Sequence, residues 1–388
     1  MRALTPEAVE FLASPTAQQE LARLADAGLE PLATLAELRK RWSEAEAAWL
    51  YDQALLRKKA AAKFPQAAKM LFEAEALEQA SGWAVAGWRA KEVFGPYQTV
   101  ADLGAGIGGD ALALAAAGKR VLAVERDPLR ARLLEHNAAA LGLTERIKVV
   151  HADWREVELE VEAAFADPAR RSGGRRTVRL SEMEPPLADL ERLAGRLPAL
   201  AVKLAPALDK AELPAGVGLG FVSYGGELKE ALAGFGRLAW PRPWAAVLPA
   251  GAVLEGPETP AVVGPPAGYL YEPDPAVIRA GLVGRLATEL EARLLTEQVA
   301  YLSGDGCRAT PLARCWRLVR HGPYSFKTLK RWLAEFDARA VNVKRRRSPV
   351  DPAALAAKLK VKGNGPEVTV FLTRIQEKPW MLLGLEPA

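Results

Sequence analysis

The chain has few of the residues that build disulfide frameworks and metal sites. Its 388 residues include two cysteines, Cys307 and Cys315, and three scattered histidines. Two cysteines exclude a disulfide framework and a cysteine metal cluster, and three separated histidines argue against a structural zinc site. We therefore expect the functional site to hold no metal.

Long apolar runs are also missing. No run of about 18 apolar residues occurs, which is near the length that a membrane-spanning helix needs. The first residues, M-R-A-L-T-P, lack an apolar signal segment. We therefore expect a cytoplasmic protein with no membrane partner. Half of the residues are hydrophobic, enough for substantial cores. A chain of this length is expected to form two or three domains.

Positive charge is concentrated at one end of the chain. The net charge is +5, but from Asp305 onward 17 Lys and Arg stand against 7 Asp and Glu. Acidic residues outnumber basic ones in the rest of the chain. A basic segment attached to an acidic body suggests that the C-terminal part binds a polyanion. Nothing in the sequence indicates an oligomeric state.

Residues 99–127 have the pattern of a strand, a glycine turn, a helix and a second strand. Gly104, Gly106 and Gly108 leave the turn without bulky side chains at alternate positions. Such a turn lets a ligand approach the backbone, and the following helix directs free N–H groups to the same place. Glu125 ends the second strand, where a carboxylate suits the hydroxyls of a ribose. The unit predicts a site for an adenosine-containing cofactor.

The acidic residues favour one cofactor over another. Gly104, Gly106 and Gly109 also fit the dinucleotide pattern G-x-G-x-x-G, which alone is a weak signal. Asp102 lies two residues before the first glycine, where it would face a pyrophosphate unfavourably. It can instead pair with the cationic amino group of S-adenosylmethionine (SAM). Asp153 and Asp167 end two later apolar segments. The sequence favours SAM and leaves a nicotinamide cofactor as the minor alternative.

Composition and periodicity divide the chain into four segments. Alternating strand and helix patterns predict a doubly wound α/β sheet, and the C-terminal segment predicts the order βαβαββ. A helix is expected from Asp274 to about Leu295, whereas residues 225–238 fit either a helix or part of a hairpin. The predicted segments are a helical domain at 1–95, a catalytic domain at 96–250, a linker with a connecting helix at 251–304 and a basic domain at 305–388.

Several motifs in one order resemble the trimethylguanosine synthase branch of the class I SAM-dependent methyltransferases: G-A-G-I-G-G-D, V-E-R-D-P, H-N-A-A-A-L-G-L and F-A-D-P. The C-terminal V-N-V-K-R-R and V-D-P-A-A-L-A-A-K-L-K are similar to the THUMP-like domain of a group of bacterial methyltransferases. The resemblance implies a Rossmann-like class I methyltransferase sheet with an N-terminal helical domain and a C-terminal α+β THUMP-like domain. It also implies RNA as a partner.

The resemblance assigns roles at the cofactor by position. Asp102 would neutralise the methionine end, and Glu125 would bind the ribose hydroxyls. Asp153 would take the adenine amino group, and Trp154 would pack on the adenine ring. The complete set expected at the cofactor is Asp102, Gly104, Ala105, Gly106, Gly108, Glu125, Arg126, Asp153 and Trp154.

The loop after the fourth strand departs from the pattern of enzymes that methylate base nitrogens. Those enzymes typically carry D/N/S-P-P followed by an aromatic residue that stacks on the base. Here the loop reads D-P-A-R-R and has no aromatic residue. Arg170 would replace it, because guanidinium planes also stack on bases and bind phosphate. We expect Asp167, Pro168 and Arg170 to be the catalytic residues, with Asp167 receiving the acceptor amine.

The predicted function is SAM-dependent methylation of a base nitrogen in RNA. Lys203 is a secondary candidate for the site, with an ordinary surface lysine as the alternative. The alternatives for the whole protein are a methyltransferase of protein or small molecules and a non-catalytic SAM-binding protein associated with RNA. The residues expected to bind substrate are Phe64, Arg171, Lys344, Arg345 and Arg346.

Overall fold

The computed structural model describes residues 4–26, 28–168, 171–172, 175–176, 180, 183 and 185–387. The chain folds into two compact units. The first unit comprises Met1–Gly218 and Leu232–Trp240, and the second comprises Leu219–Ala231 and Pro241–Ala388. The four segments expected from the sequence stay a prediction.

The first unit begins with helices whose starts follow local capping chemistry. Thr5 and Ser14 each accept a backbone N–H with their side chain, and a proline follows each at the first helical position. Ser43 forms a capping box with Glu46. The helices are α1 (Pro6–Ala13), α2 (Pro15–Ala25), α3 (Pro31–Leu38), α4 (Glu44–Ala60), α5 (Ala74–Gln79) and α6 (Trp83–Glu92).

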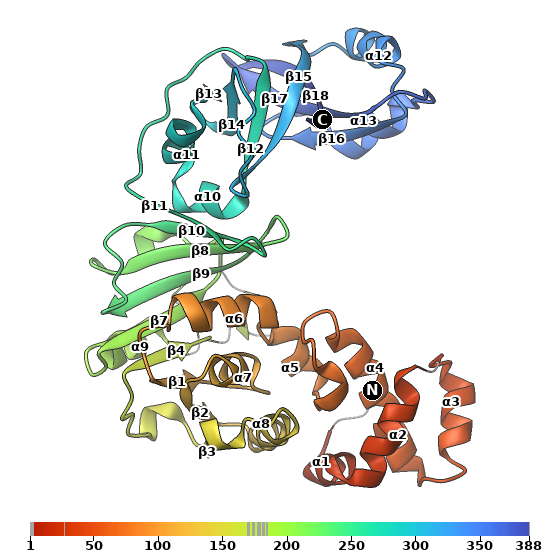
Figure 1. Cartoon of the computed structure of the whole chain (residues 1–388), viewed down its shortest axis with the longest axis vertical. Helices are drawn as coiled ribbons and strands as arrows, with labels where there is room; N and C mark the ends of the chain where they lie inside the picture. Colours follow the sequence, from red (N-terminus) through yellow and green to blue (C-terminus); the bar gives the residue numbers. More distant parts are fainter. Residues whose placement is uncertain are drawn as a thin grey trace. The chain divides into compact units, whose positions relative to one another are not determined.

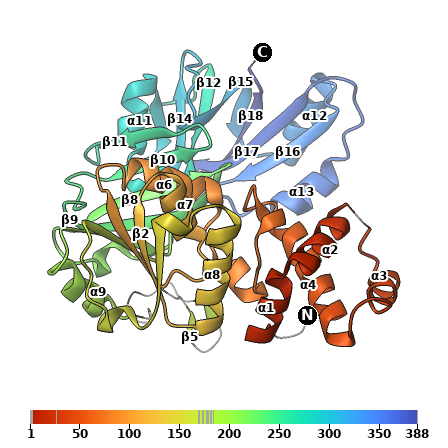
Figure 2. The same cartoon turned by 60° about the horizontal axis from the view of Figure 1, so that its bottom comes forward.

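A parallel sheet forms the centre of the first unit. Its strands run in the order β7-β4-β1-β2-β3, and the end of β9 continues the order beside β7. Helices α7 and α8 pack on β2 and β3, and α6 lies beside α7 (Figures 1 and 2). The elements are β1 (Thr99–Leu103), α7 (Gly109–Ala116), β2 (Arg120–Glu125), α8 (Pro128–Ala140), β3 (Ile147–His151), β4 (Ala163–Ala166), α9 (Leu187–Ala194), β7 (Ala199–Leu204) and β9 (Glu227–Gly236). Two short strands, β5 (Arg171–Ser172) and β6 (Arg175–Arg176), pair separately.

Asn137 of α8 joins three parts of the first unit. Its Oδ1 accepts the Leu71 N–H at 2.8 Å, and its Nδ2 donates to the carbonyls of Leu71 and Ile107, each at 3.1 Å. The side chain is fully buried. One of the three asparagines of the chain thus ties the segment before α5 to the glycine turn after β1.

The second unit contains two groups of strands. In the first group, β10 (Trp244–Leu248) pairs in parallel with β8 (Gly218–Tyr224) and antiparallel with β11 (Ala252–Glu255). The second is a seven-stranded sheet in the order β13-β14-β12-β15-β18-β17-β16. Its elements are β12 (Tyr269–Pro273), α10 (Pro275–Ala280), α11 (Val283–Leu290), β13 (Arg293–Thr296), β14 (Val299–Gly304), β15 (Ala313–Pro323), α12 (Phe326–Glu335), β16 (Ala340–Arg345), α13 (Pro352–Leu359), β17 (Glu367–Ile375) and β18 (Lys378–Leu385).

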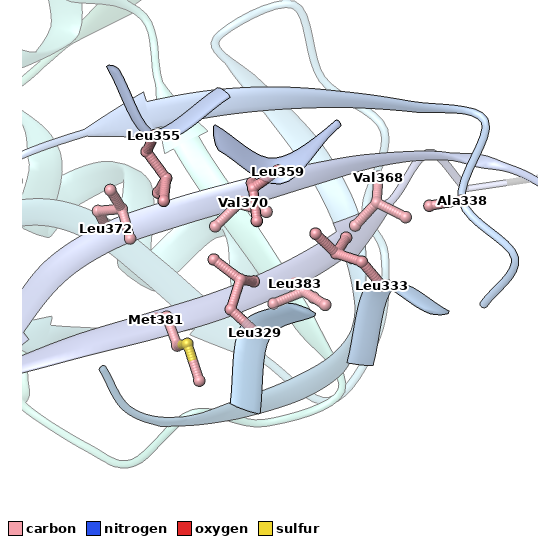
Figure 3. Close-up of a cluster of buried hydrophobic side chains, with 10 residues drawn as sticks. All are labelled: Leu329, Leu333, Ala338, Leu355, Leu359, Val368, Val370, Leu372, Met381 and Leu383. Carbon is pink, nitrogen blue, oxygen red and sulfur yellow. The ribbon is translucent and has the colours of Figure 1, made fainter. Parts of the chain in front are cut away.

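The predicted βαβαββ order is present as β15-α12-β16-α13-β17-β18. Helices α12 and α13 cover one face of this part of the sheet, and Figure 3 shows their leucines directed at the strands. Leu329 and Leu355 are at most 3% exposed, as expected for apolar side chains at helical spacing that pack on a sheet. The core cluster consists of Leu329, Leu333, Ala338, Leu355, Leu359, Val368, Val370, Leu372, Met381 and Leu383.

The structure corrects one expectation and decides another. The single helix expected from Asp274 to about Leu295 is instead α10, α11 and the start of β13. Gly281 ends α10 in the left-handed region at φ +81°, so the chain turns before α11 begins. Within residues 225–238, which fit a helix or part of a hairpin, Glu227–Gly236 form strand β9. Within the described part of the chain, no helix has the length and hydropathy needed to cross a membrane.

We expect Asn137→Ala to lower the free energy of unfolding by about 2–4 kcal/mol, because it leaves buried backbone groups of Leu71 and Ile107 without partners. Urea denaturation followed by circular dichroism measures the change. Glu135→Ala, at an exposed position of the same helix, is the control and should change stability by less than about 0.5 kcal/mol. Equal stability of the two variants would contradict this role for Asn137.

Candidate active site

Carboxylates at neighbouring strand ends border one cavity in the first unit. β1 pairs in parallel with both β2 and β4, so Asp102, Glu125 and Asp167 lie at the same edge of the sheet. The cavity at this edge has a volume of about 680 Å³. The residues predicted from the sequence that line it are Asp102, Gly104, Ala105, Gly106, Glu125, Arg126, Asp153, Trp154, Asp167, Pro168 and the secondary candidate Lys203.

The glycine turn presents backbone rather than side chains to this cavity. Gly104 and Gly106 have positive φ, and a Cβ at either position would meet no atom within 4 Å. At Gly108, which also has a positive φ, a Cβ would come within 2.3 Å of a Leu134 methyl carbon. Gly108 therefore serves the packing of α8, whereas Gly104 and Gly106 leave space open for a ligand.

Glu125 fixes the shape of the turn. Its Oε2 accepts the Gly106 N–H at 2.7 Å, and its Oε1 accepts the Asp127 N–H at 2.8 Å. Asp127 in turn caps α8 by accepting the N–H groups of Leu129 and Arg130. The carboxylate that the sequence assigns to a ribose is thus also a structural acceptor for the turn, and each oxygen retains a further lone pair.

Asp102 is a buried carboxylate with an incomplete set of hydrogen bonds. It is 2% exposed, and its Oδ2 has no hydrogen-bond partner among the described residues. Burial raises the pKa of Asp102 well above its usual range, and the nearby Asp110 carboxylate raises it further. Arg89 opposes this rise in the pKa without removing it. An unpaired acceptor in this environment favours a cationic partner.

Arg89 and Asp110 were not identified from the sequence, yet they form a buried ion pair beside Asp102. Arg89 extends from α6, is 1% exposed, and lies with its guanidinium carbon 4.3 Å from the centre of the Phe165 ring. The charge of Arg89 holds the pKa of Asp110 below its ordinary value against the opposing effect of burial. An arginine at helical spacing with Val85 and Ala86, on the buried face of α6, was the available signal.

Lys203 lines the same cavity and contacts Asp167, where the acceptor is expected. It is 7% exposed, which excludes the alternative of a surface lysine. Its Nζ pairs with the Asp167 carboxylate and donates to Ser81 Oγ at 3.1 Å. Ser81 Oγ also accepts from Arg89 at 3.3 Å. The Asp167 carboxylate therefore has a fixed position next to Pro168 at the cavity wall.

Asp153 and Trp154 line the side where the adenine is expected. Asp153 accepts hydrogen bonds from the side chain of Arg155 at 3.0 and 2.6 Å. These bonds lower the pKa of Asp153 to about 2, against the opposing effect of burial. Its carboxylate is therefore ionised at neutral pH and remains an acceptor for an amino group.

The other predicted residues do not line this cavity or lie outside the residues that the structure describes. Phe64 is 1% exposed and packs against Phe72 in the core, with no surface for a substrate. Arg170 lies outside the described residues, and for Arg171 only the backbone is described. Lys344, Arg345 and Arg346 belong to the second unit.

Comparison with known proteins identifies the family of the chain. Residues 88–166 match the TRM5/TYW2 methyltransferase domain family, and residues 313–386 match the THUMP domain-like family. The chain is 34% identical over 361 residues to proteins of Mycobacterium tuberculosis strains CDC 1551 / Oshkosh and H37Rv, both described as uncharacterized S-adenosylmethionine-dependent methyltransferases. This match covers 87% of the chain and 95% of each relative.

A solved structure extends the similarity to the fold. The crystal structure of a candidate methyltransferase from Porphyromonas gingivalis W83 has a TM-score of 0.78 to this chain, with 20% sequence identity and 100% coverage of both chains. At this identity the likeness establishes the architecture alone. The whole chain therefore shares its fold with that protein.

The fold and the site define a class I methyltransferase. The chain belongs to the SAM-dependent methyltransferases, and it carries a THUMP-like domain at its C-terminal end. SAM is the cofactor, and the described residues fit it. The orphaned Asp102 oxygen would accept from its ammonium group, and the open space at Gly104 and Gly106 would admit it close to the backbone.

We expect SAM affinity to rise with pH, because the ammonium group of bound SAM would lower the raised pKa of Asp102. Binding strengthens from the pKa of the complex up to the higher pKa of the free protein and is constant above it. The slope is up to about tenfold per pH unit within this window. Titration calorimetry over a range of pH values measures it.

Asp102→Asn is the control, because it keeps the shape of the side chain and removes its titration. The variant should bind SAM more weakly and show only the pH dependence of SAM itself. Identical pH profiles for the variant and the wild type would contradict the assigned role of Asp102.

Proposed function

We propose that this enzyme methylates a base nitrogen in RNA, with Asp167 receiving the acceptor amine. The observation that supports the proposal most is the position of the Asp167 carboxylate. It borders the cavity beside Pro168 and is held by Lys203, which also donates to Ser81. A carboxylate held in this way accepts an N–H of an amino group and orients the nitrogen lone pair.

The chemistry needs placement more than acid or base catalysis. SAM supplies a methyl group that its sulfonium charge has already activated. The chain then has to bring a neutral nitrogen into line, and a fixed hydrogen-bond acceptor achieves this. Arg170, next to this loop in sequence, would stack on the base or bind a phosphate.

In this proposal, the other carboxylates of the cavity bind the cofactor. Asp102 would neutralise the methionine end, Glu125 would bind the ribose and Asp153 the adenine amino group. We also propose that the catalytic part is related to the trimethylguanosine synthase branch. The four segments predicted from the sequence are proposed as the domains of the chain.

RNA phosphates require cationic partners, and of the predicted Lys344, Arg345 and Arg346 the ion pairs of the second unit leave Arg345 available. Lys344 pairs with Glu272, and the nearest ion-pair atoms of Arg346 and Glu272 are 3.6 Å apart. Arg345 and Arg347 are exposed, and no ion pair is described for them. We infer that Arg345 and Arg347, with the exposed Lys358, Lys360 and Lys362, carry the phosphate contacts.

The test is transfer of a labelled methyl group from SAM to separate pools of RNA, protein and metabolites, followed by mass spectrometry of the nucleosides. The proposal requires label in RNA and a methylated base nitrogen. Label in the protein or metabolite pool alone would favour the alternative acceptors. SAM binding without transfer would favour a non-catalytic role.

We expect Lys203→Met to reduce methyl transfer at least about tenfold, because the Asp167 carboxylate loses its cationic partner. SAM affinity should change much less, since the assigned cofactor contacts remain. Lys203→Arg should recover part of the rate, and Lys148→Met, at an exposed lysine of β3, should not alter it. Equal rates for the wild type and Lys203→Met would remove Lys203 from the mechanism.

Reversal of the exposed charges should weaken RNA binding and leave SAM binding intact. For the double variant Arg345→Glu/Arg347→Glu, we expect lower affinity at every salt concentration. The slope of log K against log salt should fall by about 0.7–0.9 for each lost phosphate contact. Fluorescence anisotropy with labelled RNA measures both effects.

The control is Lys91→Glu/Arg120→Glu, which makes the same change in net charge at exposed positions of the first unit. Its RNA affinity should remain close to that of the wild type. If both double variants lose the same affinity, the effect comes from net charge alone and the assigned surface is wrong.

A further inference from the structure

The fold brings the two cysteines of the chain together. Cys315 lies in β15, and Cys307 lies in the connection between β14 and β15. Their sulfur atoms are 2.7 Å apart. A disulfide holds its sulfur atoms about 2.05 Å apart, so bond formation requires a shift of well under 1 Å.

Both cysteines are held in place by their neighbours. Cys315 is fixed in the sheet, where β15 pairs with β12 and Tyr271 stands opposite it. The hydroxyl group of Tyr271 holds the connection that contains Cys307. Its Oη donates to the Gly306 carbonyl at 2.6 Å and accepts the Arg308 N–H at 2.8 Å. The residues before and after Cys307 are thus anchored to the same tyrosine that pairs with Cys315.

Arg308 adds a second anchor to this connection. Its guanidinium pairs with the Glu291 carboxylate at 2.5 Å and donates to the Glu289 carbonyl at 3.2 Å. The close approach of the two sulfur atoms is therefore built by contacts on both sides of the connection. Nothing in the assigned methyltransferase site uses these residues.

We propose that Cys307 and Cys315 form a reversible redox modification site that closes to an intramolecular disulfide. Cys307 is exposed and meets the oxidant first, whereas Cys315 is partly buried. The oxidant is a small organic disulfide. The Cys307 thiolate attacks one of its sulfur atoms, a mixed disulfide forms, and one small thiolate leaves.

The second step closes the site. Cys315 gives up its proton to solvent and attacks the Cys307 sulfur, and the second small thiolate departs. In sum, two protein thiols are oxidised to one disulfide, and one organic disulfide is reduced to two thiols. The second step is intramolecular, so it is favoured by the short separation of the sulfur atoms.

The test uses the full-length protein, reduced and then exposed to an excess of oxidised glutathione. After an acid quench and denaturation, N-ethylmaleimide labels the remaining thiols and the intact mass is measured. We expect the wild type to carry neither maleimide nor glutathione and to be two hydrogen atoms lighter than the reduced protein. Peptide mapping should recover Cys307 linked to Cys315, and dithiothreitol should restore two labelled thiols.

Two single variants distinguish the roles of the two cysteines. Cys315→Ser should retain one glutathione on Cys307, because no second thiol displaces it, and Cys307→Ser should react more slowly. A wild type that keeps glutathione, keeps two free thiols or forms a disulfide-linked dimer would overturn the proposal. None of these outcomes depends on the acceptor of the methyl group, so the result is independent of the proposed function.

Discussion

The buried ion pair between Arg89 and Asp110 joins the N-terminal helices to the cofactor turn. Asp110 lies in the first turn of α7, directly after the glycines, and Asp102 lies close enough to be affected by it. Buried carboxylates destabilise a fold unless a cation is near. Arg89 supplies that cation from α6 and also packs on Phe165 of β4. Helix α6 therefore contributes a positive charge to the site.

Ser81 links this ion pair to Lys203 and Asp167, the residues next to the expected acceptor. Its hydroxyl meets both Arg89 and Lys203, and Lys203 pairs with Asp167. The backbone of Ser81 approaches α7 so closely that a Cβ on Gly109 would lie 3.3 Å from it. A glycine after the turn thus leaves this contact uncrowded, and Ser81 lies between Arg89 and Lys203.

Charge in the second unit shows why composition alone does not locate a binding surface. Lys344 of β16 and Arg346, which directly follows the strand, lie over the rings of Trp316 and Tyr301 and share Glu272. Their charges are largely used within the fold. The neighbouring Arg345 alternates to the other side of the strand and is exposed, because successive side chains of a strand point to opposite faces.

The sequence by itself determined the parallel sheet, the glycine turn and the carboxylates at the strand ends, because these depend on local periodicity and on short-range spacing. The βαβαββ order of the C-terminal part was predictable for the same reason. Only the tertiary structure decided that Arg89 and Asp110 pair, that Lys203 is buried against Asp167, that Phe64 is a core residue and that two cysteines meet. Each of these contacts joins residues from different elements, or from the two ends of a connection, and local patterns do not encode which distant partner a buried charge or thiol will meet.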